Sequence, residues 1–431
     1  MKKLSQFSGI FFVLLAGLFF SLLFSCKKEE VKVVPIVVAS SVVNITETTA
    51  VCGGEISSDG GADVTSRGVC WSLNANPTTS DKKTIDGVGK GTFNSSITGL
   101  TPGGTYYLRA YAGNSVGTAY SSQVIFTALA SEVALTTKSL SLVTTTSAAC
   151  GGAISTDGGA AVTARGVCWN TSANPTIANS KTSDGTGPGL YTSSITGLTK
   201  NTLYYIRAYA TNSVGTSYGD EILLKTFTGT VTDVENNVYN TVTIGTQVWM
   251  AENLRTTKYN DGTSITLVAD GVAWAALTTE GYCWYNNDKA TYKTPYGGLY
   301  NWYAVNPANN GGKNVCPEGW KVPGDDQWTS LADFLGGNMG SGGRLKEAGM
   351  EHWLSPNTGA TNETGFTALP GGNRSANGEY VGINTGGNWW SLTEYEINSA
   401  WNRYLNSANS HVHPQFWGKR NGVSVRCIKD L

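Results

Sequence analysis

Charged residues are scarce in this chain. Asp, Glu, Lys and Arg together make up 14% of the 431 residues, and the net charge is −1. Soluble domains usually contain about a quarter of charged residues. Nucleic acids and anionic membrane surfaces attract proteins through basic patches, and this composition has no excess of cations from which to build one. The composition therefore argues against nucleic acid as a partner.

Recognisable metal-binding motifs are also missing. The chain has three histidines, and two of them, His411 and His413, would share a strand face and form half of a zinc site. No third ligand is recognisable nearby, so exposed loop histidines are the simpler interpretation. Asn286, Asn287 and Asp288 offer oxygens to calcium but lack the spacing of an EF-hand. We expect no cofactor, with calcium at residues 286–288 as the remaining alternative.

No motif supplies a convincing catalytic set. Asp325 with Asp326, and Glu394 with Glu396, are the candidate carboxylate pairs of a glycosidase. Helix capping explains the first pair and surface solvation explains the second. We therefore predict that the protein is not an enzyme.

One apolar run stands out, and it lies at the N-terminus, from Ile10 to Phe24. Fifteen residues are too few for a comfortable membrane span but suit the core of a signal peptide. The Ser25-Cys26 pair that follows resembles a bacterial lipoprotein signal, in which the cysteine is lipidated and becomes the mature N-terminus. We predict a signal peptide at residues 1–25 and a lipid anchor with a tether at residues 26–36. The alternative is a plain secretory signal with an incidental Cys26.

A lipid anchor also predicts a location. Acyl chains at Cys26 would hold the protein on a membrane, at roughly 0.8 kcal/mol per buried methylene. All later residues would be extracytoplasmic, where disulfides persist. We expect an outer-membrane or cell-surface protein.

Strong helix formers are few, whereas glycine is abundant, with 53 residues. This favours β-structure with many turns. Eleven of the 13 tryptophans lie after residue 230, which indicates a domain boundary near that point. We predict a mainly β, multidomain protein.

Residues 37–228 contain the same sequence twice, at an offset of 98 residues. Arg-Gly-Val-Cys-Trp at 67–71 recurs at 165–169, and Asn-Ser-Val-Gly at 114–117 recurs at 212–215. Short alternating strands between Gly, Asp and Asn turns are typical of a β-sandwich. The spacing from Leu100 to Tyr106, repeated from Leu198 to Tyr204, resembles the tyrosine corner of fibronectin type III domains. We predict two fibronectin III- or Ig-like β-sandwich repeats, at 37–129 and 130–228, which act as spacers.

Each repeat has two cysteines 18 residues apart, Cys52 with Cys70 and Cys150 with Cys168. In an exported domain this favours two intradomain disulfides, each worth about 3 kcal/mol. The alternative is four buried free thiols, because cysteine is also a good small core residue.

Residues 229–431 form a third pattern, rich in tryptophan. Its motifs are Trp-Met-Ala-Glu-Asn-Leu at 249–254, Cys-Pro-Glu-Gly-Trp at 316–320, Leu-Pro-Gly-Gly at 369–372, Trp-Trp-Ser at 389–391 and Ser-Val-Arg-Cys at 424–427. In this order they resemble the Fibrobacter succinogenes major paralogous domain, a bacterial surface module. That family resembles C-type-lectin-like α+β folds, and its biochemical role is generally unassigned. The resemblance therefore implies a fold more than a function.

The residues between the motifs agree with such a fold. Trp328, Leu331, Ala332 and Leu335 recur at helical spacing, which predicts one apolar helix face that ends at Gly-Gly 336–337. In a lectin-like fold the last strand returns beside the first, which implies a Cys316–Cys427 disulfide. Cys283–Cys316 is the rival pairing.

The segment 389–421 mixes aromatic residues with Asn, His and Arg, as recognition surfaces do. The alternative is that its tryptophans fill the core, and we expect about half to be buried, among them Trp389 and Trp401. The predicted binding-surface residues are Trp390, Glu394, Tyr395, Arg403, Tyr404, Asn406, His411, His413 and Trp417.

Together these features predict a cell-surface lipoprotein whose C-terminal domain binds a glycan or a protein. The alternative is a structural or self-associating envelope protein without a separate ligand.

Overall fold

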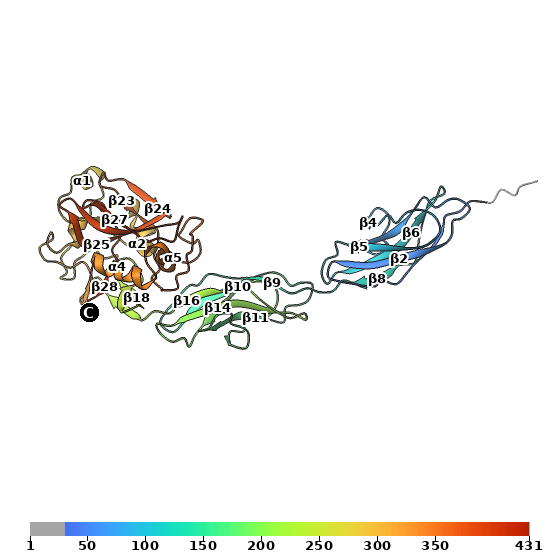
Figure 1. Ribbon diagram of the computed structural model, residues 1–431, viewed down its shortest axis with the longest axis horizontal. Helices are drawn as coiled ribbons and strands as arrows, with labels where there is room; N and C mark the ends of the chain where they lie inside the picture. Colours follow the sequence, from blue (N-terminus) through green and yellow to red (C-terminus); the bar gives the residue numbers. More distant parts are fainter. Residues whose placement is uncertain (1–30, 431) are drawn as a thin grey trace, which may run out of the picture. The chain divides into compact units, whose positions relative to one another are not determined.

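The computed structural model describes residues 31–430, so the predicted signal peptide and Cys26 lie outside the described residues. The chain divides into two compact units, the first ending at Ala130 and the second running from Ser131 to Leu431. Both consist mainly of β-strands (Figure 1). The predicted mainly β, multidomain fold class is confirmed.

The first unit is a β-sandwich. One sheet has the order β1-β2-β5. The other has the order β4-β3-β6-β7, with β8 also paired to β6. Their bounds are β1 Ile36–Ala39, β2 Thr49–Ser58, β3 Ser66–Ser72, β4 Lys82–Lys83, β5 Gly91–Thr98, β6 Thr105–Gly113, β7 Thr118–Tyr120 and β8 Val124–Thr127. Side chains from both sheets, such as Ile97 on β5 and Leu108 on β6, meet in one buried cluster.

The second repeat has the same two sheets, with the orders β13-β10-β9 and β12-β11-β14-β15, and β16 also pairs with β14. The bounds are β9 Ala134–Thr137, β10 Ala148–Thr156, β11 Ala164–Asn170, β12 Ser180–Lys181, β13 Gly189–Ile195, β14 Leu203–Thr211, β15 Thr216–Tyr218 and β16 Ile222–Lys225. In each repeat a tyrosine hydroxyl accepts a hydrogen bond from the backbone five residues earlier. Thr101 N donates to Tyr106 Oη at 2.8 Å, and Thr199 N donates to Tyr204 Oη at 3.0 Å.

The two predicted disulfides of the repeats are wrong, and the alternative of buried free thiols is correct. Cys52, Cys70, Cys150 and Cys168 are all buried and unbonded. Cys52 lies on β2 and Cys70 on β3, which belong to different sheets. The Cys52 thiol donates to Ser40 O at 3.3 Å, whereas that of Cys70 donates to Pro77 O at 3.5 Å. The equal spacing in both repeats therefore reflects duplication, not pairing.

The C-terminal domain contains two five-stranded sheets. The first has the order β17-β18-β19-β28-β22, so the last strand lies beside an early one. The second has the order β24-β23-β25-β26-β27. Their bounds are β17 Gly229–Thr232, β18 Val238–Ile244, β19 Gln247–Met250, β22 Trp320–Lys321, β23 Gly371–Arg374, β24 Tyr380–Ile383, β25 Gly386–Glu396, β26 Ser399–Asn406, β27 His413–Gly418 and β28 Ile428–Lys429. A small pair of strands, β20 Tyr282–Cys283 and β21 Leu299–Tyr300, lies between β19 and β22 in sequence.

Short helices connect these strands: α1 Gly271–Ala275, η1 Tyr285–Asn287, α2 Lys289–Tyr296, α3 Trp302–Val305, α4 Asp325–Phe334 and α5 Asn338–Leu345. Helix α4 is the predicted one. Its apolar face of Trp328, Leu331 and Ala332 is buried, together with Leu335 just beyond its end. Gly336 and Gly337 follow with φ angles of 94° and 92°, a backbone region that glycine enters without strain.

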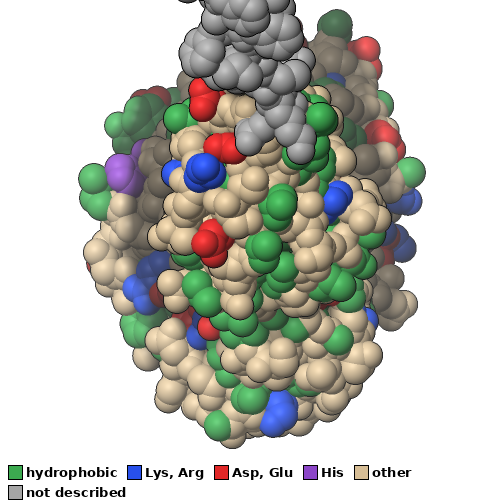
Figure 2. Space-filling model, turned by 90° about the vertical axis from the view of Figure 1, so that its right-hand side faces the viewer, with side chains coloured by type: hydrophobic (Ala, Val, Ile, Leu, Met, Phe, Trp, Pro, Cys, Tyr) green, Lys and Arg blue, Asp and Glu red, His purple; other side chains and the backbone are tan. Residues whose placement is uncertain are grey.

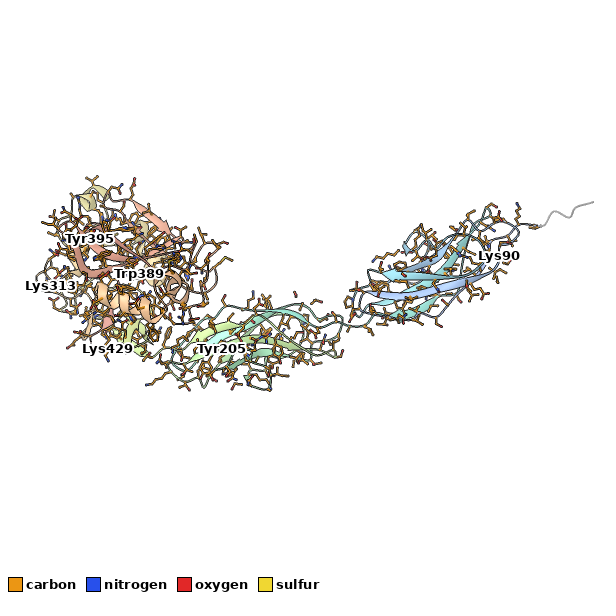
Figure 3. The ribbon with its side chains drawn as sticks, viewed as in Figure 1. Lys90, Tyr205, Lys313, Trp389, Tyr395 and Lys429 are labelled. Carbon is orange, nitrogen blue, oxygen red and sulfur yellow. A yellow bond between two sulfur atoms is a disulfide. The ribbon has the colours of Figure 1, made fainter. Side chains whose placement is uncertain are left out.

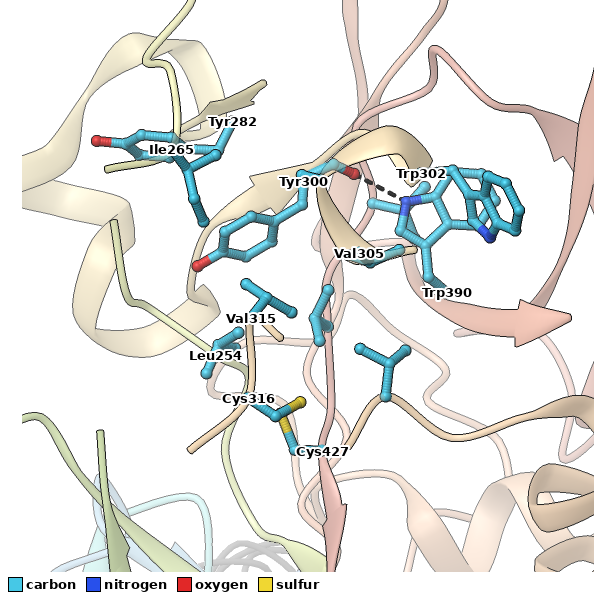
Figure 4. Packing of buried hydrophobic residues seen from close by; sticks show 14 of the residues in the cluster. Leu254, Ile265, Tyr282, Tyr300, Trp302, Val305, Val315, Cys316, Trp390 and Cys427 are labelled. Atoms are coloured by element: carbon cyan, nitrogen blue, oxygen red, sulfur yellow. Dashed lines mark hydrogen bonds between the residues drawn. A yellow bond between two sulfur atoms is a disulfide. The ribbon is translucent and has the colours of Figure 1, made fainter. Parts of the chain in front are cut away.

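Two neighbouring tryptophans on β25 face opposite sides of the second sheet. Trp389 packs with Trp249, Trp328 and Phe366 in one core. Trp390 packs in another core, and its indole Nε1 donates to Tyr300 O at 2.8 Å (Figure 4). The sheet therefore separates two hydrophobic cores, as the alternation of strand side chains requires.

A disulfide closes the domain. Cys316 and Cys427 are bonded, at a sequence separation of 111, and both lie in the core shown in Figure 4. The pairing implied by the family resemblance is confirmed. The rival is wrong, since Cys283 is a buried free thiol.

We predict that the Cys316→Ser/Cys427→Ser variant loses about 3–5 kcal/mol of unfolding free energy, because the bond closes a long loop. Urea unfolding followed by tryptophan fluorescence measures the loss. Reductant should lower the wild-type midpoint to that of the variant and leave the variant unchanged. An unchanged wild-type midpoint after both thiols have been counted as reduced would contradict the prediction.

Candidate functional site

The predicted binding surface covers β25, β26 and β27, and two of its residues are not on the surface. Trp390 is 0% exposed and Arg403 is 2% exposed. Trp390 is a core residue on the side of Tyr300. Arg403 donates from Nη1 to the Asp325 carboxylate and thereby ties β26 to the first turn of α4. These two residues are removed from the candidate surface.

Three aromatic rings form a cluster at one end of this sheet. Tyr395 on β25 stacks on Phe416 of β27, with ring centroids 4.0 Å apart and an interplanar angle of 13°. Trp401, on the strand between them, presents its ring nearly at right angles to both, at 5.0 and 6.0 Å. Tyr395 is 45% exposed and Phe416 is 49% exposed. We call these three residues the aromatic cluster.

A β-bulge places Tyr395 in this cluster. Glu394 pairs with Ala400 and Glu396 pairs with Ser399, so Tyr395 is an extra residue on β25. Bulges redirect side chains and are frequent beside functional sites. The expectation that Trp401 is buried is wrong, because its cross-strand partner Phe416 lies on the edge strand and leaves it only half-buried.

The other predicted residues lie on the opposite face of β26 or at its far end. Tyr404 is half-buried and its ring lies 5.9 Å from that of His413, its cross-strand partner. His411 and His413 have ring centroids 5.4 Å apart. Burial lowers the pKa of His413, and His411 lowers it further. The candidate residues thus divide between two faces, and only Tyr395 among them belongs to the aromatic cluster.

Two further predicted residues have structural partners. Glu394 accepts a hydrogen bond from Lys419 Nζ at 2.9 Å, and that ammonium lies 4.6 Å from the ring of Trp302. Trp417 is half-buried and packs against the core around Trp390. Figure 3 marks Trp389, one of the two buried tryptophans of β25, and Tyr395, the exposed aromatic residue of that strand.

The loop between β26 and β27 is held by a buried lysine. Lys346 is 0% exposed, and its Nζ donates to Thr358 O, Asn406 O and Asn409 O at 3.0–3.1 Å. Asn406 also shapes this loop, because its Oδ1 accepts from the backbone of Ala408 and Asn409. Burial lowers the pKa of Lys346 to about 8, so the ammonium form still prevails at pH 7. Asn406 is therefore a structural residue of the loop.

The candidate calcium ligands have other partners. Asn287 Oδ1 accepts from Tyr380 Oη at 2.8 Å, and Asp288 caps α2 by accepting from Thr291 N at 3.1 Å. These contacts explain the residues without an ion. The candidate acid Asp325 pairs with Arg403, as described above, and Glu396 accepts from Ser399 Oγ at 3.1 Å. The carboxylates singled out from the sequence are thus engaged in the fold.

Clefts in the second unit lie elsewhere. Two of them have volumes of about 710 and 440 Å³. Neither of these two is lined by a described residue of the segment 389–421. On the face in Figure 2, side chains of both charge signs are scattered among uncharged ones. The aromatic cluster thus lies outside both clefts, with Tyr395 and Phe416 exposed.

Three of the sequence motifs of the C-terminal domain, at 249–254, 389–391 and 424–427, meet at Asn253. Its Oδ1 accepts from Trp389 Nε1 at 2.7 Å and from Arg426 Nη2 at 2.7 Å, and its Nδ2 donates to Tyr296 O at 2.9 Å. Asn253, Trp389 and Arg426 come from three motifs far apart in sequence, and all are buried. We call them the asparagine knot. These motif residues build the fold.

Comparison with known families agrees with this domain. Residues 242–429 match the family model of the Fibrobacter succinogenes major domain. The match supports a surface-associated protein. No curated protein is similar to the chain at a significant level. Among residues 31–430, the helices are too short or too polar to cross a membrane.

We predict that Asn253→Ala destabilises the fold by about 3–5 kcal/mol, because it leaves the buried indole N–H of Trp389 without its acceptor and removes the Oδ1 that accepts from Nε and Nη2 of the buried Arg426 guanidinium. Thermal and urea unfolding measure the loss. Asn309→Ala is the control, because Asn309 is exposed and its side chain has no hydrogen bond among the described residues, so its loss should change stability by less than about 0.5 kcal/mol. Equal stability of the two variants would show that the knot is dispensable.

We predict that Lys346→Met lowers the unfolding free energy by about 2–4 kcal/mol, because three carbonyl oxygens lose the buried ammonium that donates to them. Amide hydrogen exchange should accelerate most in the loop 406–412. Lys429→Met serves as the control because Lys429 is exposed. Unchanged exchange in that loop would contradict the structural role of Lys346.

Proposed function

We propose that the protein is a cell-surface lipoprotein, anchored through Cys26, whose C-terminal domain recognises a glycan or a protein ligand. The two β-sandwich repeats act as spacers between the anchor and this domain. The exposed aromatic cluster carries the proposal. The family match supports a surface-associated protein and leaves the ligand open.

The aromatic cluster has the composition of a recognition site. Tyr395, Trp401 and Phe416 present a large apolar area with few rotatable bonds, so binding costs little side-chain entropy. Residues 393–398 at the tip of the β25–β26 hairpin are all exposed, including Ile397 at 81%. Exposed aromatic and aliphatic side chains grouped in this way mark interaction surfaces.

Polar groups surround the cluster. Glu394, Glu396 and Asn398 are exposed on the same hairpin and offer hydrogen-bond acceptors and donors. An apolar centre with a polar rim is the usual arrangement of a protein-binding patch. Aromatic platforms beside hydrogen-bonding side chains also suit the apolar faces and hydroxyl groups of sugars. A non-enzymatic binding role uses these features without requiring a catalytic cleft.

The scaffold under the cluster is independent of it. Trp390 ties β25 to Tyr300 O on one face of the sheet, and Arg403 ties β26 to Asp325 on the other face. Tyr395 and Phe416 are half-exposed and contact each other, so their loss leaves the two cores unchanged. Substitution at these positions therefore separates binding from folding.

The test is a screen of the full chain on arrays of immobilised glycans and extracellular-matrix proteins. We predict a binder whose affinity falls at least tenfold in the Tyr395→Ala/Phe416→Ala variant, because hot-spot aromatics contribute about 2 kcal/mol or more. Val381→Ala is the matched control, since Val381 is 46% exposed at the other edge of the same sheet.

Three results would count against the proposal. The first is a binder held equally by the double variant, and the second is the absence of any binder. The third is self-association of the wild-type chain, lost in the double variant and seen by sedimentation, with no other ligand. That outcome would favour a structural envelope protein.

A further inference from the structure

A cluster of three possible metal ligands lies away from the aromatic cluster. Glu347 and the adjacent pair Glu351 and His352 bring one ligand atom each within 4.8 Å of one another. They follow α5 in the segment that leads to Trp353. The sequence did not indicate this group, because the chain has no zinc-binding motif around His352.

The distances within the cluster suit a small divalent ion. His352 Nδ1 lies 2.9 and 3.0 Å from the two carboxylate oxygens of Glu347. Zinc binds histidine nitrogen and carboxylate oxygen at about 2.0–2.2 Å, and tetrahedral geometry then places neighbouring ligand atoms about 3.3–3.6 Å apart. The observed distances are those of a hydrogen bond, and an opening of the pair by about half an ångström would let it hold a metal ion in place of the proton.

The surroundings hold the first two ligands in place. Glu347 N donates to Ala368 O at 3.1 Å, and the Asn357 side chain donates to Glu347 O at 2.9 Å. The edge of the Tyr296 ring contacts the imidazole of His352, with centroids 5.6 Å apart. The His352 and Glu347 side chains are 25% and 16% exposed, so water competes with them less than at an open surface.

This segment contains two oxygen-bearing groups that the Glu347–His352 ion pair does not need. Glu351 is exposed and has no hydrogen-bond or ion-pair partner among the described residues, although it lies beside the Glu347–His352 pair. Asn357 is 6% exposed, and its Oδ1 is buried without a donor among residues 31–430. The segment therefore has a second carboxylate and a buried amide oxygen in excess of its donors.

We propose that Glu347, Glu351 and His352 bind a divalent transition-metal ion of the zinc class. One imidazole and two carboxylates form a nitrogen and oxygen donor set that suits such an ion better than calcium, which prefers oxygen alone. The two carboxylates balance its charge. Three protein ligands leave one tetrahedral position for water or for a carboxylate of a partner molecule.

The chain offers clean controls because it has three histidines in all. His411 and His413, with ring centroids 5.4 Å apart, are the rival pair for a surface-bound ion. The free cysteines of the described residues are buried, and burial raises the pKa of Cys70, Cys150, Cys168 and Cys283 to about 11. Because these thiols are buried, they are shielded from zinc in solution while the chain is folded.

The experiment titrates Zn²⁺ into the full chain, prepared without a histidine tag and stripped with a chelator, in competition with a chromophoric indicator. We predict one equivalent bound, with at least a tenfold loss of affinity in His352→Gln and Glu351→Gln, and no change in His411→Gln/His413→Gln. Glu351→Gln is informative because an exposed residue without a partner can be replaced without harming the fold.

A second measurement guards against misfolding. Zn²⁺ should raise the Tm of the wild-type chain and of the double histidine variant, and leave that of Glu351→Gln unchanged. Equal binding by wild-type, His352→Gln and Glu351→Gln chains would overturn the proposal. Loss of binding in the His411→Gln/His413→Gln variant alone would also overturn it. So would the absence of binding at about 100 µM Zn²⁺, a concentration well above that needed to fill a structural zinc site.

Discussion

The buried guanidinium of Arg426 is the constraint on which the C-terminal domain depends. Arg426 is 1% exposed, and its donors reach Asn253 Oδ1, Met250 O and Phe366 O. A buried cation is tolerated only when its hydrogen bonds are made, since an unpaired one costs several kcal/mol. The early strand, the 366–367 turn and the final segment must therefore assemble together. The neighbouring Cys427 then fixes this arrangement covalently through Cys316.

This arrangement separates the residues that build the domain from those that present a surface. Asn253, Trp389 and Arg426 bond to one another in the asparagine knot, and Trp390 packs in the core around Tyr300. The aromatic cluster lies at the exposed end of the same strands and contributes to neither core. A domain of this kind can change its surface residues without losing its fold, which is the property that a recognition module needs.

Local periodicity allowed some of this structure to be predicted, and long-range geometry explains the remainder. The apolar face of α4 and the duplication of the repeats follow from residue spacing alone, and the family resemblance implied the Cys316–Cys427 bond. The repeat cysteines could not be assigned from their spacing, because only the fold shows that the Cys52 thiol is directed at Ser40 O and the Cys70 thiol at Pro77 O. Trp401 was misjudged because a β-bulge at Tyr395 and an edge strand leave it only half-buried. Phe416 was missed, although the sequence contained a usable signal. Pro414 and Phe416 are two positions apart, which places both on one face of a strand, and this strand pairs with the strand of Trp401.

The segment after α5 connects the proposed metal site to the loop between β26 and β27. Lys346 and Glu347 are successive residues at an isolated bridge to Ala368, and strand-like backbone directs successive side chains to opposite sides. Lys346 holds the loop 406–409, whereas Glu347 meets His352. A ligand shifts a conformational equilibrium only by its differential affinity for the two states. Because Lys346 has three carbonyl partners and Glu347 N is bonded to Ala368 O, this segment has little freedom to move. An ion at Glu347 would therefore stabilise the loop 406–412, at the end of β26 away from the aromatic cluster, and would not switch it between two arrangements.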